Sequence, residues 1–337
     1  MRIRRSNSER IAMAGDIIKK SKKLHQMISS ANTIAIIGHM HPDGDCIGSN
    51  LGLYNYICDN YKGKTVHVYD EAFSSSFKFL SGSRKVKHEP TDERYDLAIS
   101  IDVSDMDRLG QFADIYNSAI STVCIDHHVS NHGFGDLCYV DGNASSACEA
   151  LCDLIDVDKI GEKTANCLYL GMIHDTGVFK YSSTTRKTME LAGLLIEKGV
   201  KPDFIIDETF YKKTYKQNQL MARVLLDSQL LEEGRIITGL ITKELFKELK
   251  CTTMDTEGIV EQLRLTDGVE VAVFAYQLTK ATYKFSLRSK STVDVSEIAC
   301  SFGGGGHIRA AGFECKKDYQ ETLDKVVELV KKQLDSK

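Results

Sequence analysis

The sequence of 337 residues contains no tryptophan and only three prolines, and it has no long apolar run. A membrane-spanning helix needs about 20 consecutive apolar residues, so none is expected. The basic start, MRIRRSNSER, leads into IAMAGDIIKK, which is too polar for the apolar core of a signal peptide. We therefore expect a cytoplasmic protein without a membrane partner. The scarcity of proline also excludes a proline-rich linker.

A strong excess of one charge is also lacking, since 43 Lys and Arg stand against 47 Asp and Glu. The net charge of -4 gives no general attraction for a long nucleic acid, which we therefore do not expect as a partner. With 42% hydrophobic and 27% charged residues, the composition is that of a globular protein. At roughly 150 residues per domain, the length favours two domains.

The ten cysteines are scattered along the chain and form no C-x-x-C pair. A chain of this length does not need disulfides to complete its core. We interpret all ten as reduced thiols, most of them buried.

Four short apolar runs, 33–37, 65–69, 96–101 and 121–125, are typical of buried parallel strands. Helical patterning lies at 8–29, from about Ser49, at 145–155 and at 163–174. Strands that alternate with helices predict an α/β fold with a doubly wound, mainly parallel sheet. We assign this first domain to residues 1–190.

The second half of the chain has a different pattern. Residues 191–230 look helical with charged faces, and we expect a helical connector there. Strand-like runs at 235–242, 269–278 and 282–289 and an amphipathic helix from Asp318 then predict a second, smaller α/β domain over 231–337.

Side chains that bind metals follow three of the four predicted strands of the first domain. Ligands bind beyond the carboxyl ends of the strands in open α/β sheets, so these side chains should meet at one edge. Five carboxylates and two or three imidazoles favour Mn²⁺ or Mg²⁺ and exceed what one ion needs. Two ions about 3.5–4 Å apart would use them and would serve phosphoryl hydrolysis. The set is His39, Asp43, Asp45, Asp102, Asp126, His127, His128 and Asp175.

Single members of this set would be weak signals, because a lone His or Asp at a strand end is more often a cap or turn residue. We read His41 and His132 as exposed loop residues, and His174 as a cation at a helix carboxyl end. Gly44 favours a sharp turn between the two carboxylates beside it. Ser49, at the expected helix start, is a cap or a phosphate ligand.

The segment SFGGGGHIRAAG, residues 301–312, predicts a phosphate- or nucleotide-binding loop, because glycines let backbone amides approach an anion. A flexible linker is the alternative. We expect a helix to start near His307 and Arg309. Arg288, at the end of a predicted strand, is a candidate phosphate clamp. The substrate-binding candidates are Arg288, Ser289, Gly304, Gly305, Gly306 and His307.

Six separated motifs resemble the DHH phosphoesterase superfamily with its DHH-associated C-terminal domain. They are HMHPDGDCIGS (39–49), SIDVSDMDRLG (100–110), CIDHHVSN (124–131), GMIHDTGVFKYSST (171–184), SLRS (286–289) and FGGGGHIRAAG (302–312). The resemblance implies that His39 and Asp43 bind a first Mn²⁺, and that Asp45, His127 and Asp175 bind a second. Asp102 would bridge both ions, Asp126 would support the ligands, and His128 would contact the scissile phosphate.

Within the superfamily, the chain is similar to stand-alone oligoribonucleases. The resemblance implies hydrolysis of short RNA to mononucleotides and of adenosine 3′,5′-bisphosphate (pAp) to AMP, with the second domain closing over the cleft. A phosphodiesterase for cyclic di-AMP or pApA is the alternative. A nucleotide-binding regulator without activity is a further one, which the complete donor set disfavours. A homodimer is compatible with the sequence.

Overall fold

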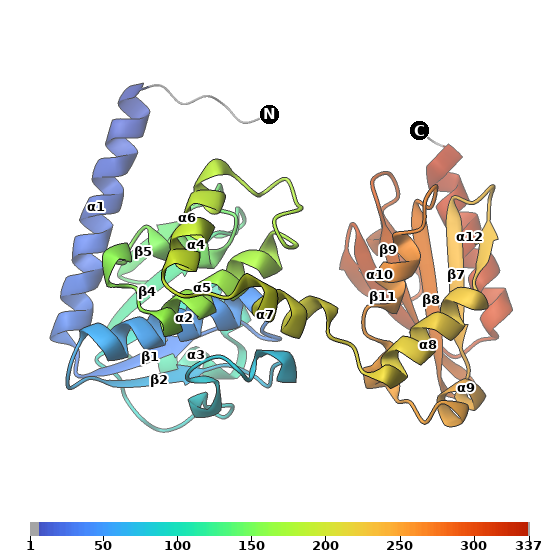
Figure 1. Cartoon of the computed structure of the whole chain (residues 1–337), viewed down its shortest axis with the longest axis horizontal. Coiled ribbons are helices and arrows are strands. Elements are labelled where there is room, and N and C mark those ends of the chain that lie inside the picture. The colour runs from blue at the N-terminus through green and yellow to red at the C-terminus, as the bar shows by residue number, and fades with distance from the viewer. Residues whose placement is uncertain (1–6, 336–337) are drawn as a thin grey trace. The chain divides into compact units, whose positions relative to one another are not determined.

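The computed structural model describes residues 7–335, and the chain divides into two compact units, Met1–Lys212 and Lys213–Lys337 (Figure 1). Each unit has its own sheet and its own hydrophobic cores. The segment 191–230, expected as a connector, is shared between the units. Helices α6 (Arg186–Glu197) and α7 (Pro202–Ile206) lie in the first unit, and α8 (Tyr215–Leu226) lies in the second.

The first unit contains a five-stranded, fully parallel sheet in the order β2-β1-β3-β4-β5. The four predicted strands are confirmed, and the α/β fold class with them. A fifth strand was not predicted, because its apolar run of four residues is shorter than the runs of the four predicted strands. The strands are β1 (Thr33–Ile37), β2 (Thr65–Tyr69), β3 (Leu97–Ile101), β4 (Ser121–Asp126) and β5 (Leu137–Val140).

Both faces of this sheet are covered, which explains why its strands read as unbroken apolar runs. In β1, Ile34 and Ile36 belong to one core, while Ala35 and Ile37 belong to the core on the opposite face. The larger core includes residues of six helices, and α3 (Ala113–Asn117) contributes to the smaller one. The six helices are α1 (Asn7–Ser30), α2 (Gly44–Asn60), α4 (Ala147–Cys152), α5 (Glu162–Asp175), α6 and α7.

Helices α2 and α5 carry the first and last of the predicted metal ligands and pack at close range. A Cβ atom on Gly48 would lie 2.6 Å from the carbonyl oxygen of Cys167 and 2.8 Å from the amide nitrogen of Gly171. No side chain fits between these backbones. The glycine therefore sets how closely the two helices approach.

Helix α2 begins five residues earlier than predicted. The carboxylate of Asp43 caps it, accepting hydrogen bonds from the amides of Asp45 and Cys46. Ser49 is fully buried inside the helix, and its hydroxyl donates to the carbonyl of Cys46. Both roles expected for Ser49, as a cap or as a phosphate ligand, are therefore wrong.

The second unit is built on a mixed six-stranded sheet in the order β10-β11-β9-β8-β7-β6, in which only β7 and β8 run parallel. Helices α11 and α12 contribute to the core on one face, while α8 and α10 contribute to that on the other. Three strands and the last helix were predicted. The elements are β6 (Gln229–Leu231), β7 (Ile236–Ile241), α9 (Lys243–Glu248), α10 (Ile259–Arg264), β8 (Val271–Thr279), β9 (Thr282–Ser289), α11 (Val295–Ser301), β10 (Gly305–His307), β11 (Ala310–Cys315) and α12 (Tyr319–Asp335).

Two further expectations concern the whole chain. Among residues 7–335, no helix combines the length and apolar character required to span a bilayer. All ten cysteines are free thiols, and only Cys58 and Cys300 are exposed.

The contact between α2 and α5 gives a prediction about stability. We expect Gly48→Ala to lower the free energy of unfolding by about 3 kcal/mol, because the new methyl group meets backbone atoms that cannot turn aside. The matched control is Gly193→Ala, in the exposed part of α6 with open space around it, which should stabilise the protein by about 0.5–1 kcal/mol. Urea denaturation followed by circular dichroism measures both. An unchanged Gly48→Ala variant would show that the helices can separate freely.

Candidate functional site

His39 lies two residues after the end of β1 and is almost fully buried. Its Nδ1 lies 2.8 Å from the carbonyl oxygen of Met40, which accepts the ring N–H and leaves Nε2 as the free donor atom. This Nε2 lies 3.4 Å from Asp102 Oδ2 and 3.9 Å from Asp43 Oδ1. Burial alone would lower the pKa of His39, but the two carboxylates outweigh it and raise that pKa. The same carboxylates would attract a metal cation.

Asp45 lies at the first turn of α2 and is completely buried. Its carboxylate accepts hydrogen bonds from the backbone amides of Ala147, at 2.5 Å, and Cys148, at 3.1 Å, where α4 begins. Burial raises the pKa of Asp45, and the neighbouring charges of Asp102 and Asp175 raise it further. Such a concentration of buried carboxylates is costly unless a cation balances it.

Asp102 lies at the end of β3 and at the centre of the donor cluster. Its backbone has a φ of 64°, in the left-handed region that only Gly, Asn and Asp adopt readily. Its Oδ1 lies 3.5 Å from His127 Nε2 and 3.6 Å from His128 Nδ1, while its Oδ2 faces His39. Within the described residues, Oδ1 is buried and has no hydrogen-bond partner. One carboxylate thus faces donors on both sides.

Asp126 is the last residue of β4, and two further predicted residues, His127 and His128, follow it. His127 Nε2 lies 3.1 Å from Asp175 Oδ2 and 3.8 Å from Asp45 Oδ2. Burial would lower the pKa of His127, but the carboxylates of Asp102 and Asp175 raise it to about 12. His128 Nδ1 donates to Asp126 Oδ1 at 2.8 Å, and this bond raises the pKa of His128.

Asp126 is fully buried, and its carboxylate orients His128 through this hydrogen bond. Burial raises the pKa of Asp126, but hydrogen bonds from His128 and Asn131 more than offset it and leave the pKa below its ordinary value. The Asn131 amide donates to the second oxygen, Oδ2, at 2.8 Å. The carboxylate is therefore ionised and fixed in orientation.

Asp175 ends α5, and the backbone reverses immediately after it. Gly177, Val178 and Phe179 all have positive φ values, which is unfavourable for a β-branched valine. The buried hydroxyl of Thr176 stabilises this turn, donating to the carbonyl of Met172 and accepting from the amide of Phe179. The strained turn fixes the backbone directly after the Asp175 carboxylate.

These side chains form three groups whose donor atoms lie within 4.8 Å of one another. The groups are His39 with Cys46 and Asp102, Asp102 with His127 and His128, and Asp45 with His127 and Asp175. Asp102 and His127 each belong to two of them. The chemistry of the donors and the unpartnered oxygen of Asp102 both fit divalent metal ions.

Four residues of this region were not found from the sequence as members of the site. Cys46 Sγ lies among the donors, Asn131 holds Asp126, and the guanidinium of Arg108 lies 3.2 Å from His39 Nδ1. Asp70, which follows β2, is fully buried and accepts from Asn50. Burial raises the pKa of Asp70 to about 8. Asp70 does follow a predicted strand, so the strand-end rule could have identified it.

His174 is a neutral aromatic contact, and the expected helix-end cation is wrong. Its ring lies between Phe77 and Phe210, with centroid distances of 5.1 and 4.5 Å. Burial lowers its pKa to about 4. The same ring explains Gly44, where a Cβ atom would lie 2.1 Å from His174 Cγ. Gly44 does not have a positive φ, so its role is close approach and not a sharp turn. His41 and His132 are exposed, as expected.

The glycine-rich segment of the second unit forms a β-hairpin, so the helix start predicted near His307 is wrong. Strands β10 and β11 pair Gly305 with Gly312 and His307 with Ala310. Gly306 has a φ of 147°, and a Cβ on Gly304 would lie 2.3 Å from the carbonyl oxygen of Gly312. These glycines permit the close strand pairing, while Gly305, Gly306 and His307 remain exposed.

Arg288 lies opposite Ala310 in the strand next to this hairpin. Burial lowers its pKa, and the nearby positive charge of Arg264 lowers it further. Ser289 is buried, and its hydroxyl donates to the carbonyl of Val293 at 2.7 Å. Arg288 and the hairpin are thus neighbours, whereas the hydroxyl of Ser289 stabilises the local fold.

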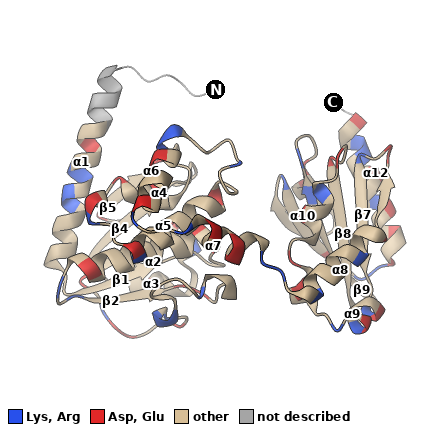
Figure 2. Ribbon diagram, in the orientation of Figure 1, with Lys and Arg blue, Asp and Glu red and all other residues tan. Residues whose placement is uncertain are grey.

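Charge is distributed over both units without a strong separation of sign. Figure 2 shows Lys and Arg interspersed with Asp and Glu on the helices of each unit. This pattern offers no extended basic stripe along the drawn helices of the kind that a long nucleic acid would follow.

The fold and the donor set define a phosphoesterase of the DHH class. The DHH family, N-terminal domain, matches residues 33–172, and the DHHA1 domain matches residues 238–336. A Streptococcus mutans protein named "Probable bifunctional oligoribonuclease and PAP phosphatase NrnA" is 34% identical over 300 residues, which cover 86% of this chain and 92% of that protein. The chain therefore belongs to the DHH family of phosphoesterases.

The chain is also similar to two other proteins. The crystal structure of an exopolyphosphatase-related protein from Bacteroides fragilis is 26% identical, covers 93% of this chain and 96% of that one, and has a TM-score of 0.82. The cyclic-di-AMP phosphodiesterase PdeA from Listeria monocytogenes is 25% identical to this chain. The matched region covers 88% of this chain and 47% of that protein.

The low pKa of His174 predicts a pH dependence of stability. The unfolded chain binds a proton near pH 6.5, whereas the folded ring resists protonation down to about pH 4. The contribution of the neutral His174 ring to the free energy of unfolding is therefore complete above pH 6.5. It falls by at most about 3 kcal/mol as the pH drops towards 4. In chelator-treated protein, the stability of wild type relative to His174→Leu should fall over that window, measured by urea denaturation. A difference that stays level from pH 7 to pH 4 would contradict a neutral His174.

Proposed function

We propose that this chain hydrolyses short oligoribonucleotides to mononucleotides and pAp to AMP with the help of divalent metal ions. The observation that carries the proposal is the cluster of three donor groups joined by Asp102 and His127. The name of the Streptococcus mutans relative, which matches over most of both chains, supports the choice of substrates.

Two Mn²⁺ ions are the proposed cofactor, with Mg²⁺ as the substitute. His39 and Asp43 would hold the first ion, Asp45, His127 and Asp175 the second, and Asp102 would contact both. Ions bound there supply an activated water and offset the negative charge of the phosphate. The paired orientation of the Asp102 oxygens towards His39 and His127 supports this division.

His128 is the proposed contact to the scissile phosphate. Its side chain is 42% exposed, whereas the neighbouring donors are mostly buried, so substrate can reach it. Asp126 accepts the Nδ1 proton and thereby directs Nε2 away from the carboxylate. The Asp126 carboxylate raises the pKa of His128, which favours the protonated ring, whose Nε2 can donate to a phosphate oxygen.

The proposed substrate-binding residues of the second unit offer groups that can bind a phosphate or a nucleotide. Arg288 can bind a second phosphate with its planar fork, and the backbone of Gly304, Gly305 and Gly306 lies on the neighbouring hairpin with His307. Ser289 would act by stabilising the strand end that carries Arg288.

Hydrolysis of cyclic di-AMP or pApA is the second candidate. It is supported by the similarity to the Listeria monocytogenes phosphodiesterase, which extends over most of this chain at lower identity. The donor cluster suits either reaction, so only the measured rates on the different substrates can distinguish the two candidates.

A substrate panel tests the proposal directly. With Mn²⁺ present, we expect turnover of pAp and of two- to five-nucleotide RNA, and weak activity on long RNA. Rates on pApA and cyclic di-AMP, measured side by side, decide between the two candidates. No turnover of pAp and short RNA would refute the first.

Replacing the central carboxylate tests the metal centre. We expect Asp102→Ala to reduce kcat for pAp by at least about 10³-fold, since two of the three donor groups lose the member that they share. Titration calorimetry should show weakened Mn²⁺ binding, while circular dichroism should show a retained fold. Asp92→Ala removes an exposed carboxylate elsewhere and is the matched control. Equal activity in the two variants would exclude the assigned role of Asp102.

A further inference from the structure

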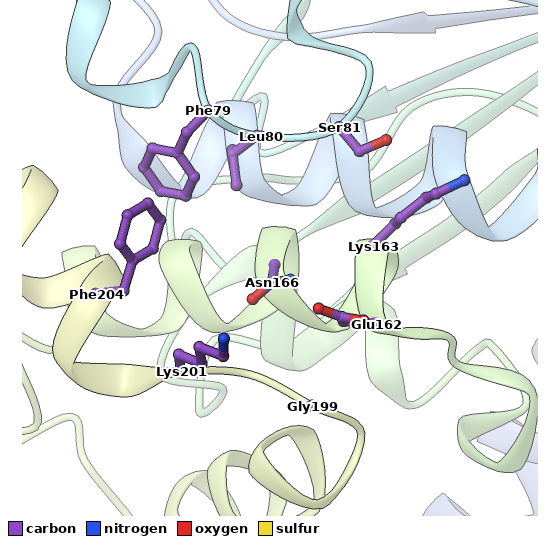
Figure 3. Close-up of a pocket in the computed structure, with 9 residues that line it drawn as sticks. All are labelled: Phe79, Leu80, Ser81, Glu162, Lys163, Asn166, Gly199, Lys201 and Phe204. Carbon is purple, nitrogen blue, oxygen red and sulfur yellow. The ribbon is translucent and has the colours of Figure 1, made fainter.

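The first unit contains a cavity of about 550 Å³ that the proposed reaction does not use (Figure 3). Its walls come from the segment 79–81, the first turns of α5 and the segment 199–204. Lys163, on its wall, precedes Asp175 by twelve residues of the same helix, or about 18 Å. The cavity is therefore distinct from the metal centre, and its volume is that of a small-ligand site.

One end of the cavity is aromatic. Phe79 and Phe204 meet edge to face, with ring centroids 5.2 Å apart. Figure 3 shows both rings on the same side of the cavity. Phe204 is 47% exposed, so part of its ring is open to a ligand. Exposed aromatic faces of this kind can stack on a nucleobase.

The remaining wall is polar and carries unused groups. Within the described part of the chain, the side chains of Lys163, Asn166 and Lys201 have no hydrogen bond or ion pair. Gly161, the residue before α5, supplies no side-chain cap, so the first amides of this 14-residue helix add positive potential. Glu162 is the single acidic side chain of the lining, and its stem lies beside Gly199.

We propose that this cavity binds a nucleoside monophosphate as an effector. The base would stack at Phe79 and Phe204, the phosphate would lie between Lys163 and Lys201, and the amide of Asn166 would bond to the sugar or base. Aromatic rings at one end and two lysines beside an uncapped helix match the two halves of such a molecule.

The walls of the cavity also connect it to the metal centre. Phe77 lies two residues before Phe79, and Phe210 lies six residues after Phe204, in η5 (Asp207–Tyr211). Phe77 and Phe210 are the two rings that hold His174, next to Asp175. A ligand that changes the spacing of Phe79 and Phe204 therefore acts on both sides of His174. Binding should alter the rate of hydrolysis without competing with substrate.

Binding is tested by titration calorimetry with AMP, adenosine, ribose 5-phosphate and inorganic phosphate. Wild type with Mn²⁺ should show two AMP sites. Asp102→Ala should retain only the cavity site, and the pair Lys163→Gln with Lys201→Gln should weaken that site at least about 10-fold. The matched control is Lys19→Gln with Lys22→Gln, two exposed lysines on α1. Phe204→Ala should weaken the binding of AMP, which contains a base, and leave the binding of ribose 5-phosphate unchanged.

Several results would overturn the proposal. They are loss of all AMP binding in Asp102→Ala, an equal effect of the two lysine pairs, or binding of adenosine as tight as that of AMP. In kinetics with pAp, AMP should inhibit wild type with a non-competitive component that the Lys163→Gln and Lys201→Gln pair lacks. Purely competitive inhibition in both proteins would refute the effector role. The paired variant should hydrolyse pAp normally without added AMP, so a negative result leaves the proposed reaction intact.

Discussion

The position of a single buried carboxylate, that of Asp102, organises the catalytic unit. Parallel strands bring their carboxyl ends to one edge, but the side chain must still turn between donors that arrive from β1 and β4. The left-handed backbone at Asp102 achieves this turn, at a cost of about 1 kcal/mol or more. The surrounding fold has to supply that energy, and the two-sided cores that fix β3 provide the rigidity.

The rest of the site shows how backbone groups hold acidic side chains in place. Asp43 caps α2, and Asp45 accepts the first amides of α4, so each carboxylate is bound to a helix start. Asp126 is held instead by side chains, His128 and Asn131. These contacts place the carboxylates before any cation arrives. The charge that they concentrate is the feature that favours binding of a cation.

Much of the first unit could be predicted because buried parallel strands read as apolar runs, and the polar residues that follow them stand out. Asp70 was missed although it obeys the same rule, since its signal is one residue in an otherwise ordinary loop. His174 could not be read correctly, because its protonation depends on Phe77 and Phe210, which are far from it in sequence. The hairpin looked like a loop before a helix because its first strand, Gly305–His307, contains no apolar residue that would indicate a strand.

At Gly48, helix α2 touches the backbone of α5 directly. Asp45 and Asp175 sit on two helices whose separation is fixed by main-chain atoms, and not by side chains that can adopt other rotamers. The distance between these two backbones is therefore a property of the scaffold. If Asp45 and Asp175 hold the proposed ion, this fixed distance would favour a cation whose radius matches it.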